Sequence, residues 1–297
     1  MRFPPGAVLC LLAVTGAAGL REAVAASPST RQDVSLRDYG LKPGNATHRE
    51  LPRRLREISG LAMTDDQRLL AHHDEAGVVF EIDVRDGSIV KEFRLADMAD
   101  PVADDFEGIA VAGGSVYLVT SAGRLYECRE GGDGESVLYE VHTTAVGREC
   151  EVEGLAYEPA ERQLLLMCKG DPRGGPLERL AIHRWSIDAE RLADDPPIVL
   201  RALDIARELG VDRYQPSGIE RHPASGNYFV LAARQSAIAE VTPTGRILSV
   251  RRFEAPWHRQ LEGVTFAASG TLIVADEGGR RRAPGRLTLY PGSERRE

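Results

Sequence analysis

The sequence lacks an excess of basic residues: it has 37 lysines and arginines against 45 aspartates and glutamates, a net charge of −8. Binding to nucleic acid depends on clustered lysine and arginine that displace counterions from the phosphates, so this balance argues against a nucleic-acid partner. The chain also lacks a Gly-x-Ser-x-Gly elbow, the paired histidines of zinc proteases and a phosphate-binding glycine loop. No motif therefore points to one of these reactions.

An apolar run of about 20 residues, which a membrane-spanning helix requires, is missing too. The first residues come nearest, with Arg2 before the apolar segment 7–20 and small residues at 23–26. This layout predicts a secretory signal peptide over residues 1–26, with an uncleaved membrane anchor as the alternative. Residues 27–297 are then expected to form a single domain of an exported protein. We expect a periplasmic or cell-envelope location, either free or peripherally associated with the membrane.

What the chain does contain is a repeat, in which five hexapeptides share the order polar, apolar, Glu or Ser, Gly, aliphatic, small. The copies occupy residues 57–62, 105–110, 151–156, 215–220 and 260–265, and their glycines are 48, 46, 64 and 45 residues apart. Except for the third interval, these spacings match the ~40–50 residues of a four-stranded propeller blade. The sequence therefore predicts an all-β, five-bladed β-propeller, with a sixth, degenerate blade as the alternative.

The long third interval and the end of the chain need separate explanations. The interval contains a Pro- and Gly-rich segment at 172–176 and a predicted helical turn over 203–209, so we interpret it as an insertion. After Gly263 only 34 residues remain, enough for three strands of ~5–6 residues but hardly for four. We expect residues 33–51 to supply the fourth strand and close the ring, which removes the exposed edges of an open sheet.

Oxygen-bearing side chains recur beside the motif glycine. The residues immediately before it are Ser59, Glu107, Glu153, Ser217 and Glu262, and those three before it are Glu57, Asp105, Glu151, Gln215 and Gln260. Positions one and three before the glycine share a strand face, and equivalent positions of a propeller's innermost strands become neighbours around its axis. These side chains are therefore expected to converge at one mouth of the central channel.

Converging carboxylates repel one another unless a cation lies between them. The repeated positions carry no His or Cys, and an all-oxygen set favours a hard ion such as calcium, which takes six to eight oxygens. We predict a calcium site that uses Glu107, Glu153 and Glu262, with Ser59, Ser217, Asp105 and Glu151 as further candidates. The alternative is an ion-pair network between these acids and nearby bases, namely Arg56, Arg148, Lys169, Arg213, Arg234 and Arg259.

Cysteine is scarce, and one of the four, Cys10, lies in the predicted signal peptide. An exported protein can keep disulfides. Cys150 precedes the motif strand of the third repeat, and Cys168 ends the strand expected to pair with it. This topology favours a Cys150–Cys168 disulfide and leaves Cys128 as a buried thiol.

The repeated segments also carry a family resemblance. The phrases at 57–62, 106–110, 152–157, 235–241 and 261–266 resemble the SdiA-regulated family of exported bacterial proteins, and the resemblance runs from about Ser35 to the end of the chain. It implies a five-bladed propeller with a calcium site, distantly related to NHL-repeat propellers. It implies no established reaction.

Two functions follow from this interpretation. The first is a monomeric binding or scaffold module, in which calcium stabilises the propeller and the channel mouth meets a small ligand or a protein partner. The second is a calcium-dependent hydrolase, a lactonase or phosphoesterase, in which Glu107 or Glu153 would activate water. The absence of histidine from the repeated positions favours the first.

Overall fold

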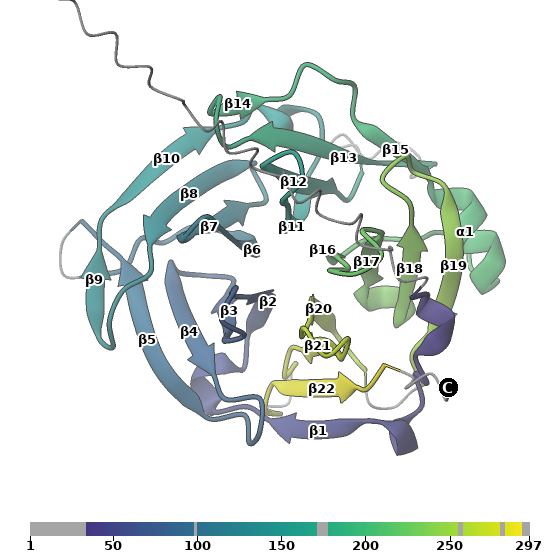
Figure 1. The fold of residues 1–297 in the computed structure, drawn as a ribbon, viewed down its shortest axis with the longest axis horizontal. Coiled ribbons are helices and arrows are strands. Elements are labelled where there is room, and N and C mark those ends of the chain that lie inside the picture. The colour runs from purple at the N-terminus through teal and green to yellow at the C-terminus, as the bar shows by residue number, and fades with distance from the viewer. Residues whose placement is uncertain (1–33, 98–99, 171–177, 255–257, 280–282, 293–297) are drawn as a thin grey trace, which may run out of the picture. The chain divides into compact units, whose positions relative to one another are not determined.

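The computed structural model describes residues 34–97, 100–170, 178–254, 258–279 and 283–292. Within the compact unit Arg31–Glu297, the strands form five sheets arranged as the blades of a β-propeller (Figure 1). The prediction of an all-β propeller with five blades, rather than six, is confirmed. The predicted signal peptide and the segment 172–176 lie outside the described residues.

Each blade is a mainly antiparallel sheet whose first strand lies nearest the axis (Figure 1). Blade 1 contains β2 (Ile58–Met63), β3 (Leu69–His73), β4 (Val78–Ile82) and β5 (Ile89–Leu95), and blade 2 contains β6 (Phe106–Ala112), β7 (Ser115–Thr120), β8 (Arg124–Arg129) and β10 (Tyr139–Thr143). Blade 3 contains β11 (Val152–Glu158), β12 (Gln163–Cys168), β13 (Arg179–Ser186), β14 (Arg191–Leu192) and β15 (Ile198–Arg201). Blade 4 contains β16 (Gly218–Arg221), β17 (Tyr228–Ala232), β18 (Ala237–Val241) and β19 (Ile247–Arg252).

Blade 5 is completed by the other end of the chain. Its strands β20 (Leu261–Phe266), β21 (Leu272–Asp276) and β22 (Arg286–Tyr290) are followed outwards by β1 (Thr47–Glu50), which pairs antiparallel with β22. The predicted closure of the ring by an N-terminal strand is therefore confirmed. Blade 1 also gains an outer strand from another part of the chain, because β9 (Glu135–Val137) from the second repeat pairs in parallel with β5.

The long third interval is an insertion, as the sequence predicted. It holds β14 and β15, both paired with β13, and the helix α1 (Ala202–Leu209). Ala202, Ile205 and Ala206 form the buried face of the helix, which ends at Gly210 in the left-handed conformation. Short 3-10 helices lie at Leu36–Asp38, Pro43–Asn45, Arg53–Leu55, Val146–Arg148 and Ala233–Gln235. None of the described helices has the length and apolar character needed to cross a membrane.

The core lies between the blades. Five buried hydrophobic clusters each join two consecutive blades; one, for example, contains Leu70 and Phe93 of blade 1 together with Phe106 and Leu118 of blade 2. Both faces of a blade are therefore buried, and strands such as β7 and β17 have no exposed face at all. This explains why these strands are continuous hydrophobic runs instead of alternating ones.

Candidate metal centre at one mouth of the channel

The five motif glycines meet around the propeller axis, each lying against the innermost strand of the next blade. A Cβ on Gly108 would stand 2.6 Å from the backbone nitrogen of Leu155, and one on Gly154 would stand 3.0 Å from the Cα of Gly218. The contacts that complete the circle run from Gly218 to Glu262, from Gly263 to Gly60, and from Gly60 to Ile109. A side chain would meet backbone at four of these glycines and the side chains of His72 and Ile109 at Gly60, so the glycines allow the five motifs to converge.

Glu107, Glu153 and Glu262 precede three of these glycines on β6, β11 and β20. Burial raises the pKa of Glu107 to about 9, of Glu153 to about 7 and of Glu262 to about 8. For Glu107 and Glu262 the negative charge of Glu153 is the next cause. The three carboxyl groups therefore repel one another, and the folded protein without a cation holds protons here that free glutamates would release.

Lys169 provides a positive charge inside this acidic group. Its Nζ forms an ion pair with the carboxylate of Glu153 and lies 3.8 Å from that of Glu151. Burial lowers the pKa of Lys169, but the hydrogen bond to Glu153 and the surrounding carboxylates outweigh it, and the net shift is upward. The ion-pair alternative is thus present in part: Lys169 pairs with Glu153 and Glu151, and Arg56 pairs with Glu57. Glu107 forms no hydrogen bond or ion pair with any described residue.

The residues three before the glycine do not project freely into the channel. Asp105 is exposed and accepts a hydrogen bond from Ser121, and Glu151 is exposed beside Lys169. Gln260 donates a hydrogen bond to Glu277 in the same way. In each of these blades the partner is the residue that follows the second strand, and its backbone N–H also donates to the carbonyl of the motif residue, at 2.8–2.9 Å.

A second set of residues lies at this mouth, and of these the sequence pointed only to Lys169, as a base for an ion pair, and to Glu277, as a residue that could reach the mouth. It consists of Asp74, Ser121, Lys169, Ala233 and Glu277, which follow β3, β7, β12, β17 and β21. Burial raises the pKa of Asp74, and its Oδ1 is buried without a hydrogen-bond partner. Burial also raises the pKa of Glu277, and the charges of Asp74 and Glu57 add to this shift. The signal was present in the sequence, because the second strand runs antiparallel to the first and so ends at the mouth where the first begins.

Both predicted serines are buried, and one of them, Ser217, forms hydrogen bonds with backbone groups. The Ser217 hydroxyl donates to the carbonyl of Leu261 at 2.6 Å and accepts from the N–H of Ala233 at 2.9 Å, which ties blade 4 to blade 5. Ser59 is buried beside Gly60 in the narrowest part of the channel. Ser217 therefore has a structural role in addition to any contact with an ion.

A cavity of about 350 Å³ adjoins the acidic group on the side of blades 3, 4 and 5. Its charged lining residues are Glu153, Glu262, Lys169, Arg234 and Arg259. Arg234 and Arg259 are exposed, and neither forms an ion pair with a described residue. Blades 3 to 5 therefore add basic side chains to a mouth that is otherwise acidic. The volume of the cavity lies within the ~300–1,000 Å³ range of small-molecule sites.

Below the acidic group the channel is closed by aliphatic side chains, one from each blade. They follow the motif glycines and are Leu61, Ile109, Leu155, Ile219 and Val264, each only 2–3 % exposed. The cavity left between them and the glycines is about 10 Å³, no more than the space of a single water molecule. This ring, which we call the aliphatic seal, explains the aliphatic position of the motif.

The mouth offers the oxygen ligands that a hard cation requires, but its acidic side chains are not gathered around a single point. Among the described residues, no three of its acids have carboxylate oxygens that all lie within 4.8 Å of one another. The buried, unpartnered Oδ1 of Asp74 and the raised pKa values of Glu107 and Glu262 show that negative charge here is incompletely compensated. The residues fit calcium by chemistry, and glutamate side chains have the rotamer freedom to approach an ion.

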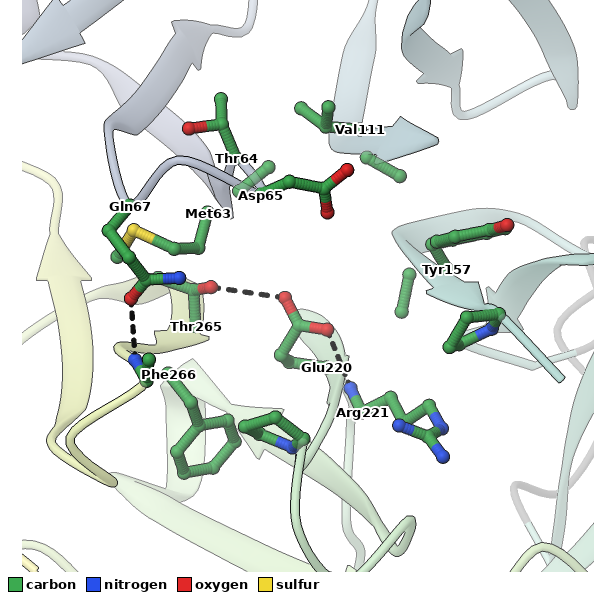
Figure 2. Close-up of a pocket in the computed structure, with 16 residues that line it drawn as sticks. Met63, Thr64, Asp65, Gln67, Val111, Tyr157, Glu220, Arg221, Thr265 and Phe266 are labelled. Atoms are coloured by element: carbon green, nitrogen blue, oxygen red, sulfur yellow. Dashed lines mark hydrogen bonds between the residues drawn. The ribbon is translucent and has the colours of Figure 1, made fainter. Parts of the chain in front are cut away.

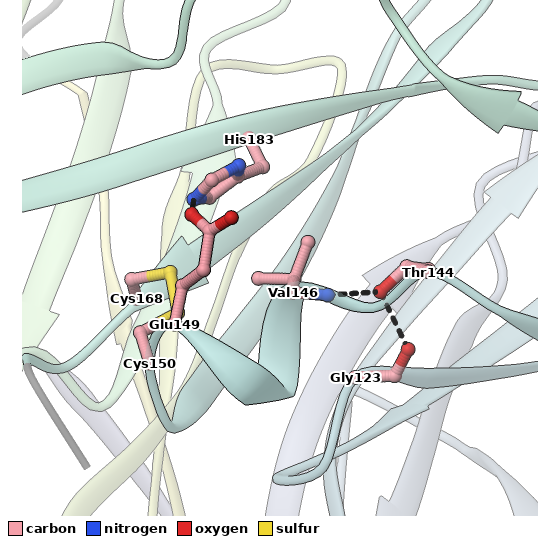
Figure 3. Close-up of a disulfide and its surroundings, with 7 residues drawn as sticks. All are labelled: Gly123, Thr144, Val146, Glu149, Cys150, Cys168 and His183. Atoms are coloured by element: carbon pink, nitrogen blue, oxygen red, sulfur yellow. Dashed lines mark hydrogen bonds and ion pairs between the residues drawn. A yellow bond between two sulfur atoms is a disulfide. The ribbon is translucent and has the colours of Figure 1, made fainter. Parts of the chain in front are cut away.

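The sulfur atoms of Cys150 and Cys168 are joined in a disulfide between the start of β11 and the end of β12, with Cα atoms 5.6 Å apart (Figure 3). Cys128 is a free, buried thiol, and burial raises its pKa to about 12. His183 and Glu149 lie beside the disulfide, with Nε2 and Oε2 4.0 Å apart. The cross-link holds together the two strands that carry Glu153 and Lys169 into the mouth.

Comparison with known proteins agrees with this architecture. Residues 47–281 match the family described as SdiA-regulated. No curated protein matches the chain in sequence. Similar solved structures include a glutaminyl cyclase from Myxococcus xanthus, with a TM-score of 0.55 and 15% identity over 82% of this chain and 95% of that one. They also include a PQQ-bound aldose sugar dehydrogenase from Streptomyces coelicolor, with a TM-score of 0.51 and 13% identity over 84% of this chain and 99% of that one. At these identities the similarity shows the fold alone.

Proposed function

The chain belongs to the SdiA-regulated family, and on that basis we propose that it is an exported binding module whose acidic mouth holds a calcium ion next to an anionic ligand. The observation that carries the proposal is the group of Glu107, Glu153 and Glu262, in which burial raises all three pKa values, the charge of Glu153 adds to the shifts of the other two, and Lys169 pairs with Glu153 alone of the three. A divalent cation removes this repulsion and replaces the protons that the ring otherwise retains.

Calcium suits this mouth better than other common ions. Zinc and copper prefer ligand sets containing histidine or cysteine, which the repeated positions lack. Magnesium requires a near-ideal octahedron, whereas calcium accepts six to eight oxygens in flexible arrangements. The mouth offers carboxylates at two levels, from the motif residues such as Glu107 and from residues after the second strands, such as Asp74 and Glu277.

The ligand is proposed to carry a carboxylate or phosphate group. Lys169, Arg234 and Arg259 line the cavity beside the acidic group, and the two arginines have no ion-pair partner among the described residues. Arginine binds carboxylate and phosphate in a bidentate manner and is well suited to this role. A small molecule, or an anionic side chain of a protein partner, would be held at these bases. We expect the mature protein to act as a monomer in the periplasm or at the cell envelope.

Isothermal titration of the chelator-treated protein with calcium tests the proposal. We expect saturable binding of one ion that is lost in Glu107→Gln and weakened at least about tenfold in Glu262→Gln, because each change removes a charged oxygen ligand. Glu140→Gln, on the exposed outer strand β10, is the matched control and should bind like the unmodified protein. Absence of calcium binding in the unmodified protein, or equal binding in Glu107→Gln, would show that the proposal is wrong.

The same mouth supports a second candidate, a calcium-dependent lactonase or phosphoesterase. The observation that favours it is that the 350 Å³ cavity brings Glu153, Arg234 and Arg259 together beside the proposed ion site. A bound calcium ion would polarise the scissile oxygen; Glu153 would accept a proton from water, and the arginines would hold the anionic group. A panel of chromogenic lactones, carboxyl esters and phosphate esters, assayed with and without chelator, distinguishes the candidates. Calcium-dependent turnover that is lost in Glu107→Gln would establish the hydrolase.

A further inference from the structure

The channel has a second mouth, on the other side of the aliphatic seal, and one repeat departs from the pattern there. The position two residues after the motif glycine is small in four blades and is occupied by Ala62, Ala110, Ala156, Glu220 and Thr265 in chain order. Blade 4 thus places a carboxylate where the others have an alanine or a threonine. Such an exchange at an interior position is costly unless the charge is used.

The small side chains leave room for a molecule. They line a cavity of about 270 Å³ together with residues from the following turns, including Met63, Asp65 and Phe266 (Figure 2). Figure 2 shows the Glu220 carboxylate among the residues that line this space, with dashed lines that join it to Thr265 and Arg221. The aliphatic seal, with its cavity of only about 10 Å³, separates this space from the acidic mouth. The second mouth is therefore a pocket distinct from the acidic one.

The Glu220 carboxylate has neutral partners only. It accepts hydrogen bonds from the backbone N–H of Arg221 at 2.7 Å and from the Thr265 hydroxyl at 3.2 Å. The guanidinium of Arg221 points away from the Glu220 carboxylate (Figure 2). It pairs with Glu158, with Nε 2.9 Å from Oε1. Glu158 also accepts a hydrogen bond from Tyr228 at 3.2 Å, which holds this ion pair in place. Among the described residues, no cation forms an ion pair with Glu220, and burial raises its pKa to about 7 although the nearby charge of Arg221 acts in the opposite direction.

We propose that this second mouth binds a small organic cation, whose ammonium group donates hydrogen bonds to Glu220 and whose alkyl chain lies against the alanines and Met63. The cavity supplies a single inward carboxylate and an exposed one, Asp65, at its rim. Two carboxylates supply at most four of the six to eight oxygens that calcium needs. A primary ammonium needs only a few acceptors, and a charge-assisted hydrogen bond to a buried carboxylate is among the stronger polar contacts.

The proposal is tested with hexylammonium as the probe and hexan-1-ol, which has the same number of heavy atoms, as the uncharged comparison. The readout is the ε-methyl NMR signal of Met63 in methionine-labelled protein, because Met63 lines this cavity; Met63→Leu identifies the signal. We expect hexylammonium to shift it in a saturable way and hexan-1-ol to bind at least about tenfold more weakly, since it lacks the charge.

Two substitutions locate the interaction. Glu220→Gln should weaken hexylammonium binding at least about tenfold, and Glu220→Ala, which restores the residue of three other blades, should fold normally and bind equally poorly. Glu107→Gln, in the opposite mouth, should leave the Met63 titration unchanged. Equal binding of hexan-1-ol, unchanged affinity in Glu220→Gln, or a Met63 shift produced by calcium in place of hexylammonium would overturn the proposal. None of these results depends on whether the acidic mouth binds calcium.

Discussion

The two mouths of the channel are built from the same five strands, but their charges arise in different ways. The acidic mouth is a product of repetition, because the same motif position brings Glu107, Glu153 and Glu262 together from three blades. The opposite mouth is lined by small residues, and its charge comes from one departure, Glu220. Repetition gathers several carboxylates at one mouth, whereas a single exception gives one directed charge. The aliphatic seal allows the two to differ.

A substitution in the aliphatic seal, which keeps the two mouths apart, should have the largest effect, and this effect is on the free energy of unfolding. Leu155 is 3 % exposed and belongs to the buried cluster between blades 2 and 3, so Leu155→Ala removes buried packing. We expect the free energy of unfolding to fall by about 3–5 kcal/mol, measured by urea denaturation. Val199→Ala, at an exposed position of β15, should change it by less than about 0.5 kcal/mol. A cost below about 1 kcal/mol for Leu155→Ala would mean that the ring is not a packed seal.

Removing the disulfide should have the next largest effect, and it acts on the acidic mouth. Cys150 and Cys168 are 18 residues apart. Cross-linking a loop of this length stabilises the folded protein by about 3 kcal/mol. We expect the Cys150→Ala, Cys168→Ala double variant to lose about that much stability in thermal or urea unfolding. Cys128→Ala is the matched control, since it removes a buried sulfur without breaking a cross-link. A double variant as stable as this control would contradict the expectation.

The smallest expected effect is a dependence on pH that sharpens the contrast between the mouths. In the folded, metal-free protein the pKa of Glu107 is about 9, above its ordinary value of 4.5, so the folded state holds a proton that the unfolded state has lost. Stability should therefore fall as pH rises between these values, and Glu107→Gln should recover about 1–2 kcal/mol at pH 8 in the presence of chelator. Urea denaturation at pH 5 and pH 8 measures the difference.

Glu220→Gln provides the comparison for this experiment. Its pKa of about 7 is closer to the ordinary value, and the charged groups around it are Arg221, Glu158 and Asp65. The recovery at pH 8 should therefore be smaller than for Glu107→Gln, and calcium should abolish the effect at Glu107 alone. Equal pH dependence of the two variants, or suppression of both by calcium, would show that the mouths are not electrically distinct.

The sequence was sufficient to predict the fold because the repeat carries both the period and the direction of the innermost strand. The spacing of the motif glycines predicted five blades, and the short remainder after Gly263 predicted closure by the N-terminal segment that contains β1. The helix α1 was likewise placed within the insertion. These features depend on local pattern and on chain length, which are visible without coordinates.

The site was only partly predictable, because contacts between repeats depend on strand register. Asp74 and Glu277 belong to no repeated motif, and they reach the mouth only because the second strand of each blade ends there. Glu220 stands in the motif itself, but its significance required knowing that positions beyond the glycine face the opposite mouth. The pairing of Lys169 with Glu153 depends on side-chain conformation, which the sequence pattern does not specify.

The pairing of β1 with β22 has a consequence for how the protein is made. Thr47 pairs with Leu289, so the outermost strand of blade 5 leaves the ribosome long before its partner exists. During synthesis β1 has an unpaired hydrogen-bonding edge, and the propeller can close only after β22 has been translated. A chain that ends before β22 would leave β1 permanently unpaired and prone to aggregate, so the whole propeller depends on the synthesis of β22.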